Sequence, residues 1–172
     1  ARVIMPLYSK IPHTLKSQME FISNFYVTIS WRKTYCGVFR AKVGKVTYYF
    51  IDNEQYFSRS QIYGEYDDSE RFAFFSMASL MLMKYLDFYP DVLHAHDWQA
   101  ALSVVYLKTK FKNDYGFNSI KTMFTIHNIE YQGKYSKAIL GDVFALDNEY
   151  LSVVEYDNLV NLLKGAMVTS DI

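Results

Sequence analysis

Two patterns of apolar and polar residues follow one another along this chain, and they predict different elements. In the first third, residues 27–32 alternate apolar with polar side chains, which is the period of a half-buried strand. Two further strand-like runs, 35–43 and 45–51, flank Gly44, and a glycine at such a reversal is typical of a hairpin. We therefore expect a β-rich hairpin excursion near residues 25–52.

Beyond this excursion the apolar residues recur every three or four positions, which is the period of a helix. The spacing from Phe72 to Leu86 predicts an amphipathic helix that ends before Pro90. Asp67 is followed three positions later by Glu70, which predicts a capping box at the start of this helix. The apolar stretch is shorter than the ~18 to 20 residues needed to cross a bilayer, so we expect a buried helix.

A strand, a helix and a second strand are predicted next, near 91–95, 97–111 and 121–126. A crossover of this length implies parallel strands in a right-handed βαβ unit. The sequence therefore predicts an α/β fold with a doubly wound, mostly parallel sheet flanked by helices. Residues 144–164 are expected to add further helix.

Composition limits the classes of partner. The chain has 172 residues, with 18 Lys or Arg and 18 Asp or Glu, so no net field attracts nucleic acid or an anionic membrane. Its length and the lack of repeats or linkers favour a single domain, 1–172. Cys36 is the only cysteine and cannot form an internal disulfide, which favours the cytoplasm. The chain opens without the features of a secretory signal, and we expect both of its ends to be truncated.

Polar and aromatic residues gather where the two predicted parallel strands end, which is where open α/β sheets bind ligands. If the strands near 91–95 and 121–126 are neighbours, the two clusters face one crevice. Sugar hydroxyls need many donors and acceptors, and the C–H faces of a pyranose pack on rings, so this set suits a sugar. The clusters contain His94, His96, Asp97 and Trp98, and then His127, Asn128, Tyr131, Gln132 and Gly133.

The same residues also have structural interpretations and a rival function. His127 fits a hydrogen-bonded histidine at a strand end, Asp97 lies where a helix N-cap belongs, and Trp98 falls on the apolar stripe of its helix. His94 and His96 point the same way in a strand and can bind zinc. The third ligand of such a hydrolase site would be His127 or Asp97.

Five blocks of sequence carry a resemblance to a known family, and they occur along the chain in the order 52–57 (DNEQYF), 63–72 (YGEYDDSERF), 94–98 (HAHDW), 124–133 (FTIHNIEYQG) and 161–166 (NLLKGA). Together they resemble successive blocks of the bacterial glycogen synthases that use ADP-glucose. That family has two Rossmann-like domains in the GT-B arrangement, and it adds glucose, with retention of configuration, to the non-reducing end of an α-1,4-glucan. The resemblance implies that this chain is the acceptor-side, amino-terminal domain and that the reaction needs no cofactor or metal.

The resemblance also implies roles for matched positions. His127 matches a histidine that lies over the donor glucose, and Asp97 and Trp98 match a pair beside the point where acceptor meets donor. We therefore expect His127 and Asp97 to be catalytic. Tyr56 matches a tyrosine that packs on bound glucan. The other expected substrate-binding residues are His96, Trp98, Asn128, Tyr131, Gln132 and Gly133.

Two parts of the family's pattern are absent from the sequence. The Lys-x-Gly-Gly loop that reaches the nucleotide phosphates would precede the first residue, and the carboxyl-terminal domain that holds most nucleotide contacts would follow the last. We therefore expect ADP-glucose to be bound mainly by the absent domain and the α-1,4-glucan acceptor by this one. The chain alone is expected to be inactive, or to act as a noncatalytic glucan-binding module.

Overall fold

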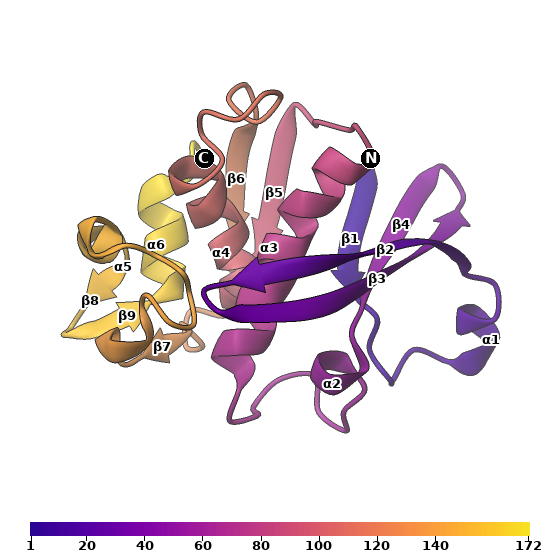
Figure 1. The fold of residues 1–172 in the computed structure, drawn as a ribbon, viewed down its shortest axis with the longest axis horizontal. Coiled ribbons are helices and arrows are strands. Elements are labelled where there is room, and N and C mark those ends of the chain that lie inside the picture. The colour runs from indigo at the N-terminus through magenta and orange to yellow at the C-terminus, as the bar shows by residue number, and fades with distance from the viewer.

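The computed structural model describes residues 1–172 as an α/β fold of three small sheets with helices packed against them (Figure 1). Two strand pairs are parallel, as expected, but four are antiparallel. The sheets are therefore mixed rather than mostly parallel. None of the helices combines the length and apolar composition needed to span a membrane.

The predicted strand-helix-strand unit is confirmed. β5 (Val92–His96) and β6 (Lys121–Thr125) are adjacent and parallel, and α4 (Asp97–Thr109) connects them and packs against both. His96 lies opposite Thr125 in the register, so both strands end at the same edge. This edge positions the candidate site.

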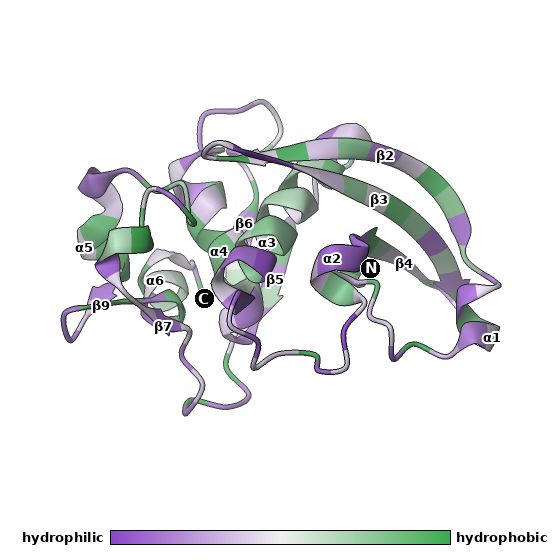
Figure 2. Ribbon diagram, turned by 60° about the horizontal axis from the view of Figure 1, so that its bottom comes forward, coloured by the Kyte–Doolittle hydropathy of each residue, from purple (hydrophilic) through white to green (hydrophobic).

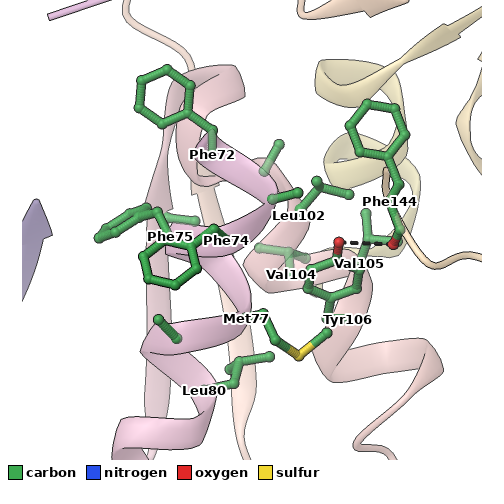
Figure 3. Close-up of a cluster of buried hydrophobic side chains, with 14 of the residues drawn as sticks. Phe72, Phe74, Phe75, Met77, Leu80, Leu102, Val104, Val105, Tyr106 and Phe144 are labelled. Atoms are coloured by element: carbon green, nitrogen blue, oxygen red, sulfur yellow. Dashed lines mark hydrogen bonds between the residues drawn. The ribbon is translucent and has the colours of Figure 1, made fainter. Parts of the chain in front are cut away.

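The long helix α3 (Asp68–Tyr85) forms the centre of the core. Its side chains are buried on almost every side because the strands of the first sheet pack against one side and α4 against another. The expected amphipathic pattern is therefore wrong, although the expected burial is confirmed. Figure 3 shows phenylalanines of α3 facing aliphatic residues of α4, and Tyr106, whose hydroxyl donates to the carbonyl oxygen of Phe144 over 2.8 Å. Full burial of one apolar side chain of this kind contributes about 1.5–3 kcal/mol to the free energy of unfolding.

The capping box predicted for α3 is wrong. Asp67 makes no capping hydrogen bond, because both of its carboxylate oxygens accept from the guanidinium of Arg59 at 2.6 Å. Glu70 does not reach back to the backbone of Asp67, since its carboxylate accepts from the Tyr56 hydroxyl and pairs with Arg32 at 3.0 Å. Long-range partners outcompete the local capping pattern here.

The expected β-rich excursion is a long antiparallel ribbon that crosses α3 (Figures 1 and 2). β2 (Glu20–Ile29) pairs with β3 (Arg32–Val43), and β3 pairs with β4 (Val46–Asp52). β4 is also parallel to β1 (Arg2–Pro6), which gives the order β1-β4-β3-β2. Figure 2 shows the hydrophobic stretches of α3 beneath this curved ribbon.

The turns of the ribbon test the predicted strand ends. The hairpin at Gly44 is confirmed, and its φ of 60° lies in the region that favours glycine. The strand expected over residues 27–32 ends at Ile29, because the chain reverses at Ser30 with a φ of 54°. Trp31 lies in this turn and is 74% exposed. Short helices follow β1 and β4, namely α1 (His13–Lys16) and α2 (Glu54–Phe57).

The last part of the chain is more irregular than expected. A continuous helix over 144–164 is wrong, because a small three-stranded sheet of order β7-β9-β8 interrupts it. β8 and β9 form a hairpin whose two-residue turn, Asp157 and Asn158, has φ values of 51° and 62°. The elements are β7 (Lys134–Tyr135), η1 (Lys137–Ile139), η2 (Asn148–Tyr150), α5 (Leu151–Val154), β8 (Glu155–Tyr156), β9 (Leu159–Asn161) and α6 (Leu162–Thr169).

Candidate functional site

The two polar clusters meet at the carboxyl ends of β5 and β6, as predicted from the expected strand pairing. The Nδ1 atom of His96 lies 3.0 Å from Nε2 of His127, although the residues are 31 positions apart. Both imidazoles are exposed to solvent. The shared crevice is therefore open on the side where a ligand would enter.

Asp97 joins the two clusters through its carboxylate. Its Oδ1 atom accepts from the backbone N–H of His127 at 2.7 Å and from that of Asn128 at 3.4 Å. Interpretation of Asp97 as an N-cap is wrong, since α4 has no side-chain cap. The φ of Asp97 is 56°, a left-handed conformation that Asp tolerates better than most residues. Asp97 thus fixes the loop after β6 rather than its own helix.

Three histidines form a row at this edge. The rings of His94 and His96 lie with centroids 4.1 Å apart, and Nε2 of His94 lies 2.7 Å from Oγ1 of Thr125. Partial desolvation lowers the pKa of His96, and the neighbouring His94 and His127 lower it further, while Asp97 opposes them. Neutral His96 is therefore favoured near pH 7.

Trp98 and Gly133 pack against one another below the crevice. Trp98 is 6% exposed, and its ring meets Phe72 edge to face at 5.1 Å. A Cβ at Gly133 would lie 2.9 Å from the Trp98 ring, and Gly133 has a φ of 63°. The packing interpretation of Trp98 is therefore supported, and Gly133 lets the loop approach the indole.

A hollow of about 110 Å³ lies beside these residues. Tyr131 is 51% exposed, and its ring lies 5.9 Å from that of Tyr63. Tyr63 and Gln99 were not predicted as site residues. Gln99 directly follows Trp98 in the sequence, and this position could have indicated that it borders the site. The lining residues are Tyr63, Asp97, Trp98, Gln99, Asn128 and Tyr131.

A larger hollow of about 570 Å³ lies elsewhere, beside Lys110 at the far end of α4. It contains none of the residues at the strand ends. We take the smaller hollow as the candidate site, because open α/β sheets bind ligands at the carboxyl ends of their strands.

Two other predicted site residues are tied into the fold. The amide of Gln132 accepts from Nδ2 of Asn161 at 2.8 Å and donates to the carbonyl oxygen of Ile129 at 3.0 Å. Tyr56 is 3% exposed and packs on Phe74 at 5.1 Å. The ring of Tyr56 is therefore in the core and not in an open polar turn, and contact with glucan stays a prediction.

The zinc hypothesis finds no support in the geometry. No group of three or more His, Cys, Asp or Glu side chains has the spacing of metal ligands. The nitrogens of His96 and His127 that would face a shared ion are instead hydrogen-bonded to one another.

Comparisons with known proteins agree with this geometry. The model of the starch synthase catalytic domain matches residues 1–172. The chain is 42% identical over 173 residues to the glycogen synthase of Desulforamulus reducens and 41% identical over 174 residues to that of Geobacillus stearothermophilus, covering 99% and 100% of this chain. It spans 36% of the length of each of these relatives.

A solved structure is similar over the same region. The catalytic domain of starch synthase IV from Arabidopsis thaliana, bound to ADP and acarbose, superposes with a TM-score of 0.86 at 28% identity, covering 99% of this chain and 36% of that one. Sequence and structure lead to the same conclusion. The chain belongs to the starch synthase catalytic domain family.

Proposed function

We propose that the longer protein containing this region transfers glucose from ADP-glucose to the non-reducing end of an α-1,4-glucan, with retention of configuration. The observation that carries the proposal is that Asp97 binds the backbone of His127 and Asn128. Asp97 and Asn128 also line the smaller hollow, together with Tyr131. Donors, acceptors and an exposed ring in one crevice suit a sugar. Starch synthase IV was solved with ADP and acarbose, which supports nucleotide and glucan as the ligand classes.

In this proposal residues 1–172 position the sugars. His127 faces the donor glucose, and Asp97 holds the backbone that carries His127 and Asn128. Tyr131, together with the small part of Trp98 that lines the hollow, borders the path of the acceptor chain. The leaving diphosphate is stabilised by the carboxyl-terminal domain that the family resemblance implies. Orientation and exclusion of water from a closed cleft are the contributions that such a half can make.

The unpaired sheet edges support the proposed domain arrangement. β1 pairs only with β4, and β5 pairs only with β6, so each leaves one edge of a parallel strand without a partner. Unpaired edges are normally covered. A further parallel strand from the longer protein, leading into the phosphate-binding Lys-x-Gly-Gly loop, would pair with such an edge. We also propose a cytoplasmic location, which the lone, buried Cys36 supports.

The test is a transfer assay on the longer protein. ADP-glucose and UDP-glucose are each supplied with a short maltooligosaccharide, and chain growth is followed by mass while NMR reports the anomeric configuration. We expect growth by α-linked glucose, faster from ADP-glucose, and no growth with residues 1–172 alone. Hydrolysis without transfer, or β-linked product, would contradict the proposal. Glucan binding without turnover in the longer protein would favour a binding module.

A further inference from the structure

A row of four polar side chains links β6 to the loop that carries His127. Oγ1 of Thr125 lies 2.7 Å from Nε2 of His94, whose ring lies on that of His96 with a centroid separation of 4.1 Å. Nδ1 of His96 is then 3.0 Å from Nε2 of His127. Because His94 and His96 are two residues apart in β5, their side chains share one face of the strand.

We propose that His96, supported by His94 and Thr125, is a positioning residue that sets the ring orientation and tautomer of His127. The inference deepens the proposed function and rests on it, since it assigns His96 a role through His127 rather than through substrate.

The tautomers of His96 and His127 are coupled by their hydrogen bond. A neutral imidazole carries one N–H, so one ring donates and the other accepts. If Nδ1 of His96 donates, the proton of His127 lies on Nδ1; if Nε2 of His127 donates, its Nδ1 is an acceptor. No other hydrogen bond within the chain involves the His127 ring, so its Nδ1 is available to a ligand. The tautomer of His96 is thereby coupled to whether a sugar hydroxyl meets a donor or an acceptor at Nδ1 of His127.

The surroundings favour the neutral form of His96. Two imidazolium rings cannot share the bond, because both facing nitrogens would then be donors. Partial desolvation and the adjacent His94 and His127 lower the pKa of His96, against the opposing charge of Asp97. The hydrogen bond with His96 is the one that holds the exposed ring of His127, since Asp97 accepts only from its backbone N–H.

The experiment compares two substitutions of His96 in the longer protein. His96→Asn keeps a polar group near the position of Nδ1, whereas His96→Phe keeps a ring over His94 and removes both nitrogens. His13→Phe, on the exposed and remote helix α1, is the matched control. The ¹⁵N shifts of labelled histidine report the tautomer of His127 directly, and kcat and KM for ADP-glucose are measured alongside.

We expect a single dominant tautomer of His127 in the unsubstituted protein and in His13→Phe, and a mixture in His96→Phe. In His96→Phe kcat should fall on the order of 10- to 100-fold, as for a reacting group misplaced by about 1 Å, while KM changes less. In His96→Asn kcat should stay close to that of the unsubstituted protein, because the amide keeps a hydrogen-bonding partner for His127. Thr125→Val, which keeps the side-chain shape but removes the hydroxyl that holds His94, should shift the same signals by a smaller amount.

An unchanged His127 tautomer in both His96→Phe and Thr125→Val would overturn the inference. A changed tautomer with an unchanged kcat would also overturn it, because positioning would then have no consequence. Failure of the proposed function has a different signature: no variant, nor the unsubstituted protein, would transfer glucose, while the ¹⁵N shifts would still report whether His96 sets the His127 ring.

Discussion

Replacement of Asp97 should release the backbone of the loop after β6. Its Oδ1 atom accepts from His127 N–H at 2.7 Å and, with weaker geometry, from Asn128 N–H at 3.4 Å. A hydrogen bond to a charged group contributes about 1.5–3 kcal/mol. Because the loop is exposed, we expect Asp97→Ala to lower the local free energy of opening by about 1.5–2 kcal/mol, at the lower end of that range.

Amide hydrogen exchange measures this loss locally. With about 1.4 kcal/mol per factor of ten, exchange at His127 should become about 10 to 30 times faster in Asp97→Ala. Asp97→Asn keeps a neutral acceptor, worth about 1 kcal/mol, so the acceleration should be only about 2- to 5-fold. Asp91→Ala, at an exposed carboxylate just before β5, is the control.

A glycine variant separates the hydrogen bond from backbone strain. Asp97 has a φ of 56°, a conformation that costs a residue with a Cβ about 1 kcal/mol or more and glycine almost nothing. Asp97→Gly should therefore exchange as fast as Asp97→Ala at His127 but unfold at a higher temperature. Unchanged exchange at His127 in all three Asp97 variants would refute the role assigned to this carboxylate.

Three further expectations concern stability and reactivity. Gly133→Ala should lower the melting temperature by the equivalent of about 1–3 kcal/mol, because its Cβ would lie 2.9 Å from Trp98 at a φ of 63°; an unaltered melting temperature would contradict this packing. Since the pKa of His96 is lowered in the folded state, the unfolded chain binds more protons as the pH falls through about 6.5, and stability is lost there. Urea midpoints should thus fall more steeply between pH 8 and pH 5 in the unsubstituted protein than in His96→Asn, and parallel curves would argue against it. Burial, and then Asp52, raise the pKa of Cys36 to about 12, so its thiol should resist an aromatic disulfide reagent at pH 8 until denaturant is added; rapid native reaction would show that the thiol is accessible.

The parts of the fold that follow from periodic sequence patterns could be predicted. The apolar runs that became β5 and β6, with a helix-length segment between them, allow only a parallel pair with a crossover. That pairing alone brought His96 and His127 to one edge. The Gly44 hairpin was predictable for a local reason, since few other residues adopt its φ of 60°.

Side-chain partners distant in sequence could not be predicted. Asp97 lies at the start of a helix, where a capping residue is expected, yet its carboxylate accepts from a backbone N–H 30 residues away. Asp67 has the local pattern of a cap and pairs with Arg59 instead. Tyr56 lies among polar residues, but its ring packs on Phe74. Local sequence describes the neighbours along the chain and not those across it.

The β8-β9 hairpin could have been predicted from the sequence, although residues 144–164 were interpreted as a helix. Asp157 and Asn158 both have positive φ, which is the conformation of a type I′ turn. Asp and Asn are among the few residues that adopt it without glycine. Read as a turn, this dipeptide would have divided the predicted helix.

Removal of the His127 side chain tests the central claim most directly. In the longer protein, His127→Ala should reduce kcat for ADP-glucose by on the order of 10² to 10⁴ fold, because the contact strengthens as the glucosyl group gains positive character. Glucan affinity and melting temperature should stay close to those of the exposed control His13→Ala. A merely structural histidine would give the opposite result, a lowered melting temperature with turnover per folded molecule intact, and that outcome would contradict the assignment of this site.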